Sequence, residues 1–224
     1  MIVTIDGPAG SGKSTTARAV AHRLGYLYLD TGAMYRAVAL AFLRTDTDPN
    51  PDGAASLLPN VEVNIQYDED EMRVFLNGDD VSDRIRTSEV GDMASQVSTL
   101  RAVREKMVEE QRRIGRERDA EEGGVVLDGR DTGTVVFPDA PVKIYMIADA
   151  MERARRRQSE YGDDVSIEEV HQEIQERDRV DRERDIAPLR KADDAIEVDT
   201  TDSTVETQVD FVVDCVKQRM AGGT

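Results

Sequence analysis

The sequence predicts an α/β fold in which helices cover both faces of a five-stranded parallel sheet. Five short apolar runs of strand length alternate along the chain with segments of helical periodicity. The first run, Ile2 to Asp6, leads directly into the segment Gly7 to Ser14, which fits the pattern G-x-x-x-x-G-K-[ST] in full. Because that pattern needs a strand before it and a helix after it, its context supports the same fold.

In the first half of the chain, apolar spacing predicts two strand–helix pairs. After the strand at 2–6, a helix runs to about residue 24, and residues 26–30 form the second strand. A second helix covers about 33–43. The segment 45–53 is rich in Pro, Gly and Asp, which is typical of a loop.

The next region has a different character. Residues 61–65 alternate between apolar and polar, and residues 72–76 form a second extended run, so together they predict a small antiparallel hairpin. A long helical region is expected over about 88–118, with a heavily charged and solvated last part.

The second half returns to the alternation of strands and helices. Strands are expected at 125–128, 142–147 and 195–199, and helices at about 149–160 and 166–179. A last helix has an apolar inner face made of Val205, Val209, Val212, Val213, Val216 and Met220.

Composition limits the classes of function. The 224 residues include 46 acidic and 29 basic side chains, and the net charge of −17 opposes general nucleic-acid binding because like charges repel. Only five of the 29 basic residues are Lys. Two explanations of the acidic surface stay open: adaptation to a cytoplasm of high salt, or an ordinary solvated surface.

Three further features of the sequence bear on where the protein is located. The single cysteine, Cys215, excludes an intrachain disulfide, and its apolar helical setting favours a buried small residue over a reactive thiol. No run reaches transmembrane length, and the N-terminus begins with a strand instead of a secretory signal. We therefore expect a cytoplasmic protein without a membrane partner, and a monomer because no long exposed apolar stripe is evident.

The Gly-rich segment predicts an ATP site. Its glycines let successive backbone N–H groups turn towards phosphate oxygens, and the following helix adds the positive end of its dipole. Lys13 would reach the β- and γ-phosphates, and the Ser14 hydroxyl would ligate Mg²⁺. The nucleotide-binding residues are therefore Gly7, Pro8, Ala9, Gly10, Ser11, Gly12, Lys13, Ser14 and Thr15.

Arginines gather in three places. Arg130 follows a strand directly, at the sheet edge where ligands bind in α/β folds. Two further clusters lie on predicted helices: Arg153, Arg155, Arg156 and Arg157, and then Arg177, Asp178, Arg179, Asp181, Arg182, Arg184 and Asp185. Phosphoryl transfer needs such positive groups, but a solvated face of alternating charge would have the same composition.

Several stretches together carry a more specific resemblance. The chain resembles the bacterial-type cytidylate kinases, within the nucleoside monophosphate kinases. The matching segments are 5–15, Asp-Thr-Gly-Ala-Met-Tyr-Arg at 30–36, 81–82 with 85–87, Ala-Ser-Gln-Val-Ser at 94–98, Asp-Gly-Arg-Asp-Thr-Gly-Thr-Val-Val-Phe-Pro-Asp-Ala at 128–140, and 177–189.

The resemblance implies a P-loop NTPase fold with a mobile lid and an antiparallel insertion in the monophosphate-binding region. It implies one domain over 1–224, whose core covers about 1–35, 86–150 and 190–220. The insertion would cover about 36–85 and the lid about 151–185. The implied activity is transfer of the γ-phosphate of ATP to CMP or dCMP, with Mg²⁺ as cofactor.

The resemblance also implies roles for individual residues. Arg36, Arg130 and Arg177 would hold the acceptor phosphate, since a guanidinium matches phosphate oxygens. Ser95, Arg104 and Asp131 would bind the base, while Thr31, Asp181 and Arg184 would lie near the ribose. Arg153 and Arg157 would act with Lys13 in catalysis by stabilising charge on the transferring group.

Two departures from the family pattern are visible. Thr132 stands where we expect a larger apolar residue, which predicts looser local packing. The segment 100–103, before Arg104, lacks an expected proline.

Two rival functions remain open. One is a related kinase that uses UMP or AMP as acceptor. Asp131 and Arg104 favour cytosine over these alternatives, because the N4 amino group of cytosine can donate to a carboxylate. The other is a nucleotide-dependent switch or regulatory module, which would be expected to lack the acceptor-site arginines. Neither histidine, His22 or His171, lies in a motif, and a kinase with an anionic phosphate acceptor needs no general base.

Overall fold

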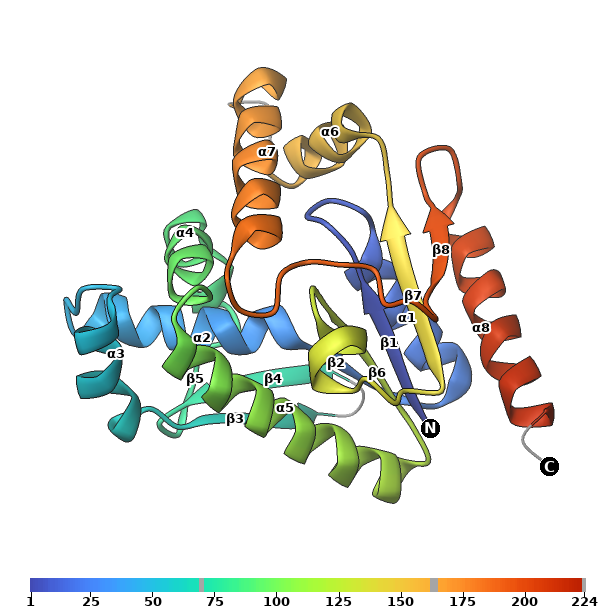
Figure 1. Cartoon of the computed structure of the whole chain (residues 1–224), viewed down its shortest axis with the longest axis horizontal. Coiled ribbons are helices and arrows are strands. Elements are labelled where there is room, and N and C mark those ends of the chain that lie inside the picture. The colour runs from blue at the N-terminus through green and yellow to red at the C-terminus, as the bar shows by residue number, and fades with distance from the viewer. Residues whose placement is uncertain (69–70, 162–164, 223–224) are drawn as a thin grey trace. The chain divides into compact units, whose positions relative to one another are not determined.

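The computed structural model describes residues 1–68, 71–161 and 165–222. The chain divides into two compact units (Figure 1). The first unit consists of residues 1–28 and 118–224, and the second consists of residues 29–117.

The predicted parallel sheet belongs to the first unit, except that the unit boundary after residue 28 falls within β2 (Leu27–Asp30). Its strand order is β2-β6-β1-β7-β8. The strands are β1 (Ile2–Asp6), β2 (Leu27–Asp30), β6 (Val125–Gly129), β7 (Val142–Ile147) and β8 (Ile196–Asp199). Strand β1 pairs in parallel with both β6 and β7, and β7 pairs in parallel with β8. The prediction of a five-stranded parallel sheet with helices on both sides is confirmed.

Among its described residues, four α-helices belong wholly to this unit. They are α1 (Lys13–Leu24), α6 (Ala150–Tyr161), α7 (Ile167–Glu183) and α8 (Val205–Ala221). Helix α8 lies alongside β7 and β8 (Figure 1). The core beneath it joins buried residues of β1, β7, α1 and α8.

The predicted inner face of α8 is only partly right. Val209, Val212, Val213 and Val216 are buried, but Val205 and Met220 are 44% and 57% exposed. These two residues lie in the first and last turns of the helix, beyond the buried middle of the same face.

Helix α7 begins with a capping box and is longer than predicted. The Ser166 hydroxyl accepts a hydrogen bond from the Glu169 backbone, and the Glu169 carboxylate accepts one from the Ser166 backbone. The helix continues to Glu183, so that Asp181 stands on its last turn. Its apolar residues Val170 and Ile174 pack with Ala154 of α6.

A π-type helical turn, η3 (Thr132–Val136), follows β6. Thr132 is only 1% exposed, and its hydroxyl donates to the Asp6 carboxylate at 2.8 Å. The expectation of looser packing at Thr132 is therefore wrong, because the hydroxyl finds a buried acceptor that an apolar side chain would not use.

The second unit begins with α2 (Thr31–Arg44). The Asp30 side chain caps it by accepting from the Ala33 backbone N–H at 2.8 Å, so the helix starts two residues before the predicted position. The predicted loop at 45–53 is partly wrong, because α3 (Pro51–Leu57) begins within it. A 3₁₀ turn, η1 (Leu58–Asn60), follows α3. Asn50 caps α3, and Pro51 takes the first helical position, which suits its fixed φ.

The predicted hairpin is confirmed and carries an additional strand. Strand β3 (Val63–Asp68) pairs antiparallel with β4 (Glu71–Leu76), and β4 pairs antiparallel with β5 (Asp79–Asp80). The sequence did not predict β5, since a two-residue strand is too short for an alternating pattern.

The predicted helical region over 88–118 is helical but divided into two helices. A 3₁₀ turn, η2 (Arg84–Arg86), precedes two helices, α4 (Ser88–Val97) and α5 (Arg101–Glu122). At the break, the Ser98 hydroxyl donates to the Ser95 carbonyl and the Thr99 hydroxyl donates to the Gln96 carbonyl. These side chains satisfy carbonyls that a continuing helix would use, and so end α4. In the parts of the chain that the structure describes, every helix is too short or too polar to span a bilayer.

Candidate active site

The turn between β1 and α1 has the backbone that phosphate binding requires. Gly10 has a φ of 74°, in the left-handed region. A Cβ on Gly10 would lie 2.9 Å from the Arg153 carbonyl oxygen, so no larger residue fits without a shift. The turn is therefore built for glycine at this position, and its following helix presents an N-terminus to an anion.

Lys13 is buried at the start of α1. Its ammonium donates to the Pro8 carbonyl at 3.3 Å, and the residue is 7% exposed. Burial, followed by the positive charge of Arg130, lowers the pKa of Lys13 to about 7, although Asp128 acts in the opposite direction. A bound phosphate would restore the charge, because an anion beside an ammonium raises its pKa.

Ser14 and Asp128 form a small oxygen site. The Ser14 hydroxyl donates to Asp128 Oδ2, and the Tyr28 hydroxyl donates to Asp128 Oδ1 at 3.0 Å. Hydroxyl and carboxylate oxygens suit Mg²⁺, which takes few protein ligands and completes its octahedron with water and phosphate. The described residues contain no cluster of three or more His, Cys, Asp or Glu that could hold a metal.

Sequence reasoning missed Asp128 as a candidate ligand, although a signal was present. Asp6, Asp30 and Asp128 each stand at the carboxyl end of a strand. Because ligands bind at that edge of a parallel sheet, an acid in each of these positions is a candidate for function.

Arg130, Asp131, Asp181 and Arg184 form one connected network. The Arg130 Nε donates to Asp181 Oδ2 at 2.7 Å. Arg184 Nη1 lies 3.4 Å from Asp181 Oδ1, and its Nη2 lies 3.5 Å from Asp131 Oδ1. Arg184 also donates to the Ala187 carbonyl, which ties the end of α7 to the segment that follows it.

The network holds its charges although it is buried. Burial by itself would raise the pKa of Asp181, but Arg130 and Arg184 outweigh it and hold that pKa below its ordinary value. Arg177 contributes to the same shift and also lowers the pKa of Lys13, which places it within electrostatic reach of both groups. The structure thus gathers Lys13, Arg130, Asp131, Arg177, Asp181 and Arg184 in the first unit.

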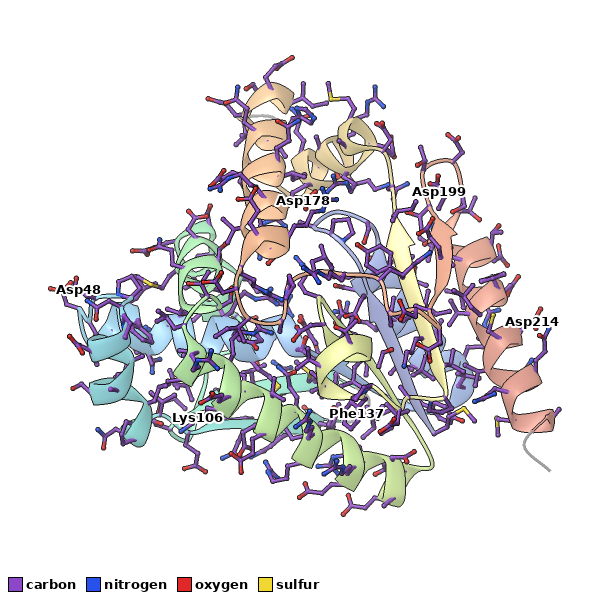
Figure 2. All side chains as sticks on the ribbon, viewed as in Figure 1. Asp48, Lys106, Phe137, Asp178, Asp199 and Asp214 are labelled. Carbon is purple, nitrogen blue, oxygen red and sulfur yellow. The ribbon has the colours of Figure 1, made fainter. Side chains whose placement is uncertain are left out.

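Arg153 behaves differently from the other arginines of α6. Its Nη1 lies 2.8 Å from Asp178 Oδ2 and donates to the Ala9 carbonyl of the phosphate-binding turn at 3.0 Å. Figure 2 shows Asp178 on the side of α7 that faces α6. Both side chains are 6% exposed, so Arg153 forms a buried bridge from the turn to α7.

The remaining arginines of α6 point to other partners. Arg155 pairs with Glu152, and Arg156 donates to the Thr200 carbonyl at 2.6 Å. Arg157 Nε lies 3.7 Å from Glu173 Oε1 of α7. Of this cluster, only Arg153 has a hydrogen bond to the phosphate-binding turn among the described contacts.

In the second unit, Thr31 and Arg36 lie at the start of α2. Thr31 is buried, and Arg36 Nη2 lies 2.8 Å from Asp30 Oδ2. Asp30 therefore both caps the helix and holds the arginine that the family resemblance assigns to the acceptor phosphate.

Ser95 and Arg104 lie on either side of the break between α4 and α5. Ser95 is half-buried on α4. Arg104 is 2% exposed, its Nη1 donates to the Ser98 carbonyl at 3.2 Å, and its guanidinium stands 5.4 Å from the centre of the Tyr35 ring. A guanidinium held so deeply in one unit is oriented by fixed partners and not by solvent.

Comparison with known proteins identifies a family. A family model described as cytidylate kinase matches residues 3–218. A cytidylate kinase from Salinibacter ruber is 63% identical over 227 aligned residues, which cover 100% of this chain and 100% of that protein. A cytidylate kinase from Bacillus cereus is 47% identical over 218 residues, covering 96% of this chain and 95% of that protein.

A solved structure supports the fold alone. An uncharacterized protein from Eubacterium ventriosum superposes with a TM-score of 0.53 at 14% sequence identity. The match covers 97% of this chain and 98% of that chain.

Proposed function

This chain belongs to the cytidylate kinase family, and we propose that it transfers the γ-phosphate of ATP to CMP or dCMP, giving ADP with CDP or dCDP. The observation that carries the proposal is the buried network of Arg130, Asp131, Asp181 and Arg184 in a chain of this family. A nucleotide switch has no need of this network, because it binds no second nucleotide as a phosphate acceptor.

ATP would occupy the turn from Gly7 to Thr15. Lys13 would neutralise its β- and γ-phosphates, and the backbone N–H groups of the turn would cradle them. Ser14 and Asp128 would hold Mg²⁺, since their oxygens already lie within hydrogen-bond reach of each other. Bound there, Mg²⁺ would offset the charge of the phosphates.

The acceptor phosphate would be held by Arg36, Arg130 and Arg177. Each guanidinium offers a planar fork of donors that matches phosphate oxygens. In the structure, Arg130 uses its Nε for Asp181, which leaves its remaining nitrogens to a ligand and to the Gly129 carbonyl. The pairing with Asp181 would therefore orient the Arg130 guanidinium and still leave donors for the acceptor phosphate.

The cytosine ring would be read by Asp131, Ser95 and Arg104. The Asp131 carboxylate would accept from the N4 amino group, and Arg104 would donate to the ring acceptors. UMP has an oxygen in place of that amino group, which would face the carboxylate and cost affinity. Asp181, Arg184 and Thr31 would lie near the ribose.

The transfer itself requires positioning and charge stabilisation. The attacking oxygen of the acceptor phosphate is already anionic, so no general base is needed. Arg153 and Arg157 would stabilise the charge that develops on the transferring group. The bond from Arg153 to the Ala9 carbonyl supports this role, because it ties the guanidinium to the turn that binds the donor phosphates.

The family also suggests where and how the protein works. We infer a cytoplasmic monomer, since an enzyme of this activity needs access to ATP and CMP, and few large apolar side chains are exposed among the described residues. Size-exclusion chromatography with light scattering tests the monomer, and a mass near 50 kDa, about twice the 24.9 kDa of the chain, would contradict it.

An assay across acceptors tests the activity. ADP formation, coupled to a reporter reaction, is measured with CMP, dCMP, UMP and AMP at saturating ATP. We expect the highest kcat/KM with CMP or dCMP, and a thermal shift with CMP but none with AMP. A preference for UMP or AMP, or no turnover with CMP, would refute the proposal.

A further inference from the structure

We propose that Asp6 is a positioning residue that holds the base-reading Asp131 through the backbone of Thr132 and Gly133. The inference rests on the proposed function, because it concerns how this chain selects its acceptor. Asp6 was not among the site residues expected from the sequence, and it would not touch either nucleotide.

The Asp6 carboxylate accepts three hydrogen bonds, all from one short segment. Its Oδ1 accepts from the Thr132 N–H at 2.9 Å and from the Thr132 hydroxyl at 2.8 Å. Its Oδ2 accepts from the Gly133 N–H at 2.7 Å. Asp6 is 4% exposed, so these three bonds satisfy a carboxylate that water does not reach.

These bonds fix the residue that precedes them. Asp131 is bonded to Thr132 through the peptide whose N–H reaches Asp6, and its own carbonyl accepts from the N–H groups of Val135 and Val136. Asp131 is thus restrained on its carbonyl side by two independent anchors. Because Asp6 directly precedes Gly7, the same carboxylate joins the start of the phosphate-binding turn to the loop that carries Asp131.

The backbone of Gly133 packs closely against β1 beside the Asp6 carboxylate. A Cβ on Gly133 would lie 2.8 Å from the Thr4 hydroxyl and 3.4 Å from Asp6 Oδ2. The close approach of the Gly133 backbone to β1 therefore requires glycine. The Thr132 hydroxyl adds a third donor at a position where the family pattern leads us to expect an apolar side chain.

The anchor is sensitive to protonation. Burial raises the pKa of Asp6 to about 6, while the bonds from Gly133 and Thr132 act against the shift and the charge of Asp131 adds to it. A protonated carboxyl would turn an O–H towards one of the N–H donors and lose that acceptor. Below about pH 6 the restraint on Asp131 therefore weakens.

Two titratable side chains of β7, Lys143 and Tyr145, lie near this site, and Arg182 of α7 acts on Tyr145. The aliphatic chain of Lys143 lies 3.4 Å from the position of a Gly133 Cβ, but its ammonium is bound to Asp194. The charge of Asp6 contributes to the raised pKa of Tyr145, after burial and with Arg182 opposing it. Burial raises the pKa of Tyr145 further above pH 6, so its hydroxyl stays protonated there.

The first test is Asp6→Asn, which keeps the shape and replaces one acceptor oxygen by a donor. We expect KM for CMP to rise about tenfold or more, KM for ATP to change less than about twofold, and the preference for CMP over UMP to fall. A purely structural role would lower the melting temperature and active fraction without separating the two KM values. Equal changes in both KM values, or none in either, overturn the proposal.

The second test keeps Asp6 and changes only its hydroxyl donor. Thr132→Val removes the bond that lowers the pKa of Asp6, so the acid limb of kcat/KM for CMP should move up by about half a pH unit. Thr132→Ser retains the hydroxyl and should restore the wild-type limb. Titration of the CMP phosphate is common to all variants and cancels when each profile is divided by that of the wild type. A Thr132→Val profile that coincides with the wild type overturns the proposal, and this test remains decisive if Asp6→Asn does not fold.

Failure of the inference differs from failure of the proposed function. If the wild-type protein does not phosphorylate CMP, the function is wrong. If it does, and the variants keep wild-type KM values and pH profiles, only the role of Asp6 is wrong.

Discussion

Helix α7 carries two sets of charged side chains that look alike in the sequence and differ in the structure. On one face, Arg179 is 55% exposed and pairs with Glu176 and Glu183, each at 2.7 Å. On the other face, Asp178 and Asp181 are buried, and Asp181 joins Arg130 with the same 2.7 Å separation. Bond length does not distinguish the two sets.

Environment distinguishes them. An exposed pair is screened by water and loses side-chain freedom on forming, so it contributes little to stability. A buried pair has already lost its hydration, and removing one partner leaves a charge that nothing compensates. The comparison teaches that each arginine of a charged helix must be assigned by what surrounds it and not by its acidic neighbours in sequence.

The largest effect on activity is expected from Arg130, the partner of the buried Asp181, and from Lys13 at the start of α1. Arg130→Ala and Lys13→Ala should each lower kcat by about 10²-fold or more, because in the proposed mechanism both groups neutralise transferring or accepting phosphate. Steady-state kinetics with CMP and ATP measures the loss. Retained turnover in either variant would show that its buried charge has no part in the reaction.

A smaller but still substantial effect on stability is expected from Asp181→Asn. It leaves Arg130 and Arg184 without their shared carboxylate and should lower the free energy of unfolding by about 3 kcal/mol at pH 7. Urea denaturation, with Asp185→Asn at an exposed position as the matched control, measures the difference. Equal stability of the two variants would contradict the assignment.

The pH dependence of this stability has a definite sign. Because the folded pKa of Asp181 lies below the ordinary value of 3.8, its contribution is complete above that value. It is lost as the pH falls through the lower folded value. The gap in stability between the wild type and Asp181→Asn should therefore narrow in acid and stay constant between pH 6 and 8, about two or more units above the ordinary carboxyl pKa.

A specificity effect of about tenfold is expected from Asp131→Ala. The variant should lose much of its preference for CMP over UMP, since the proposed acceptor for the N4 amino group is gone, and its affinity for ATP should be spared. The ratio of kcat/KM for the two acceptors measures the preference. An equal loss of CMP and ATP affinity would count against a base-reading role.

The smallest effect is expected from the exposed face. Arg179→Ala should leave kcat and KM unchanged and shift the melting temperature by no more than about one degree, because both of its partners are solvated. This variant is the matched control for Arg130→Ala. A loss of activity in Arg179→Ala would break the distinction between the two faces.

Much of the fold follows from local pattern. The strand, Gly-rich turn and helix at 2–24 were predicted because backbone conformation there depends on residues that are adjacent in the chain. The break at 98–100 was missed, since two hydroxyls that end a helix have no apolar periodicity. Strand β5 was missed because two residues cannot show alternation.

The sequence by itself determined the class of fold, the phosphate-binding turn and the arginine-rich composition of the site. Only the tertiary structure decided which charges are partners: Asp181 for Arg130, Asp178 for Arg153, and Asp6 for the backbone after Asp131. These pairs are 51, 25 and 126 residues apart. Helical and strand periodicity extends over only a few residues, whereas burial and pairing depend on how distant segments pack.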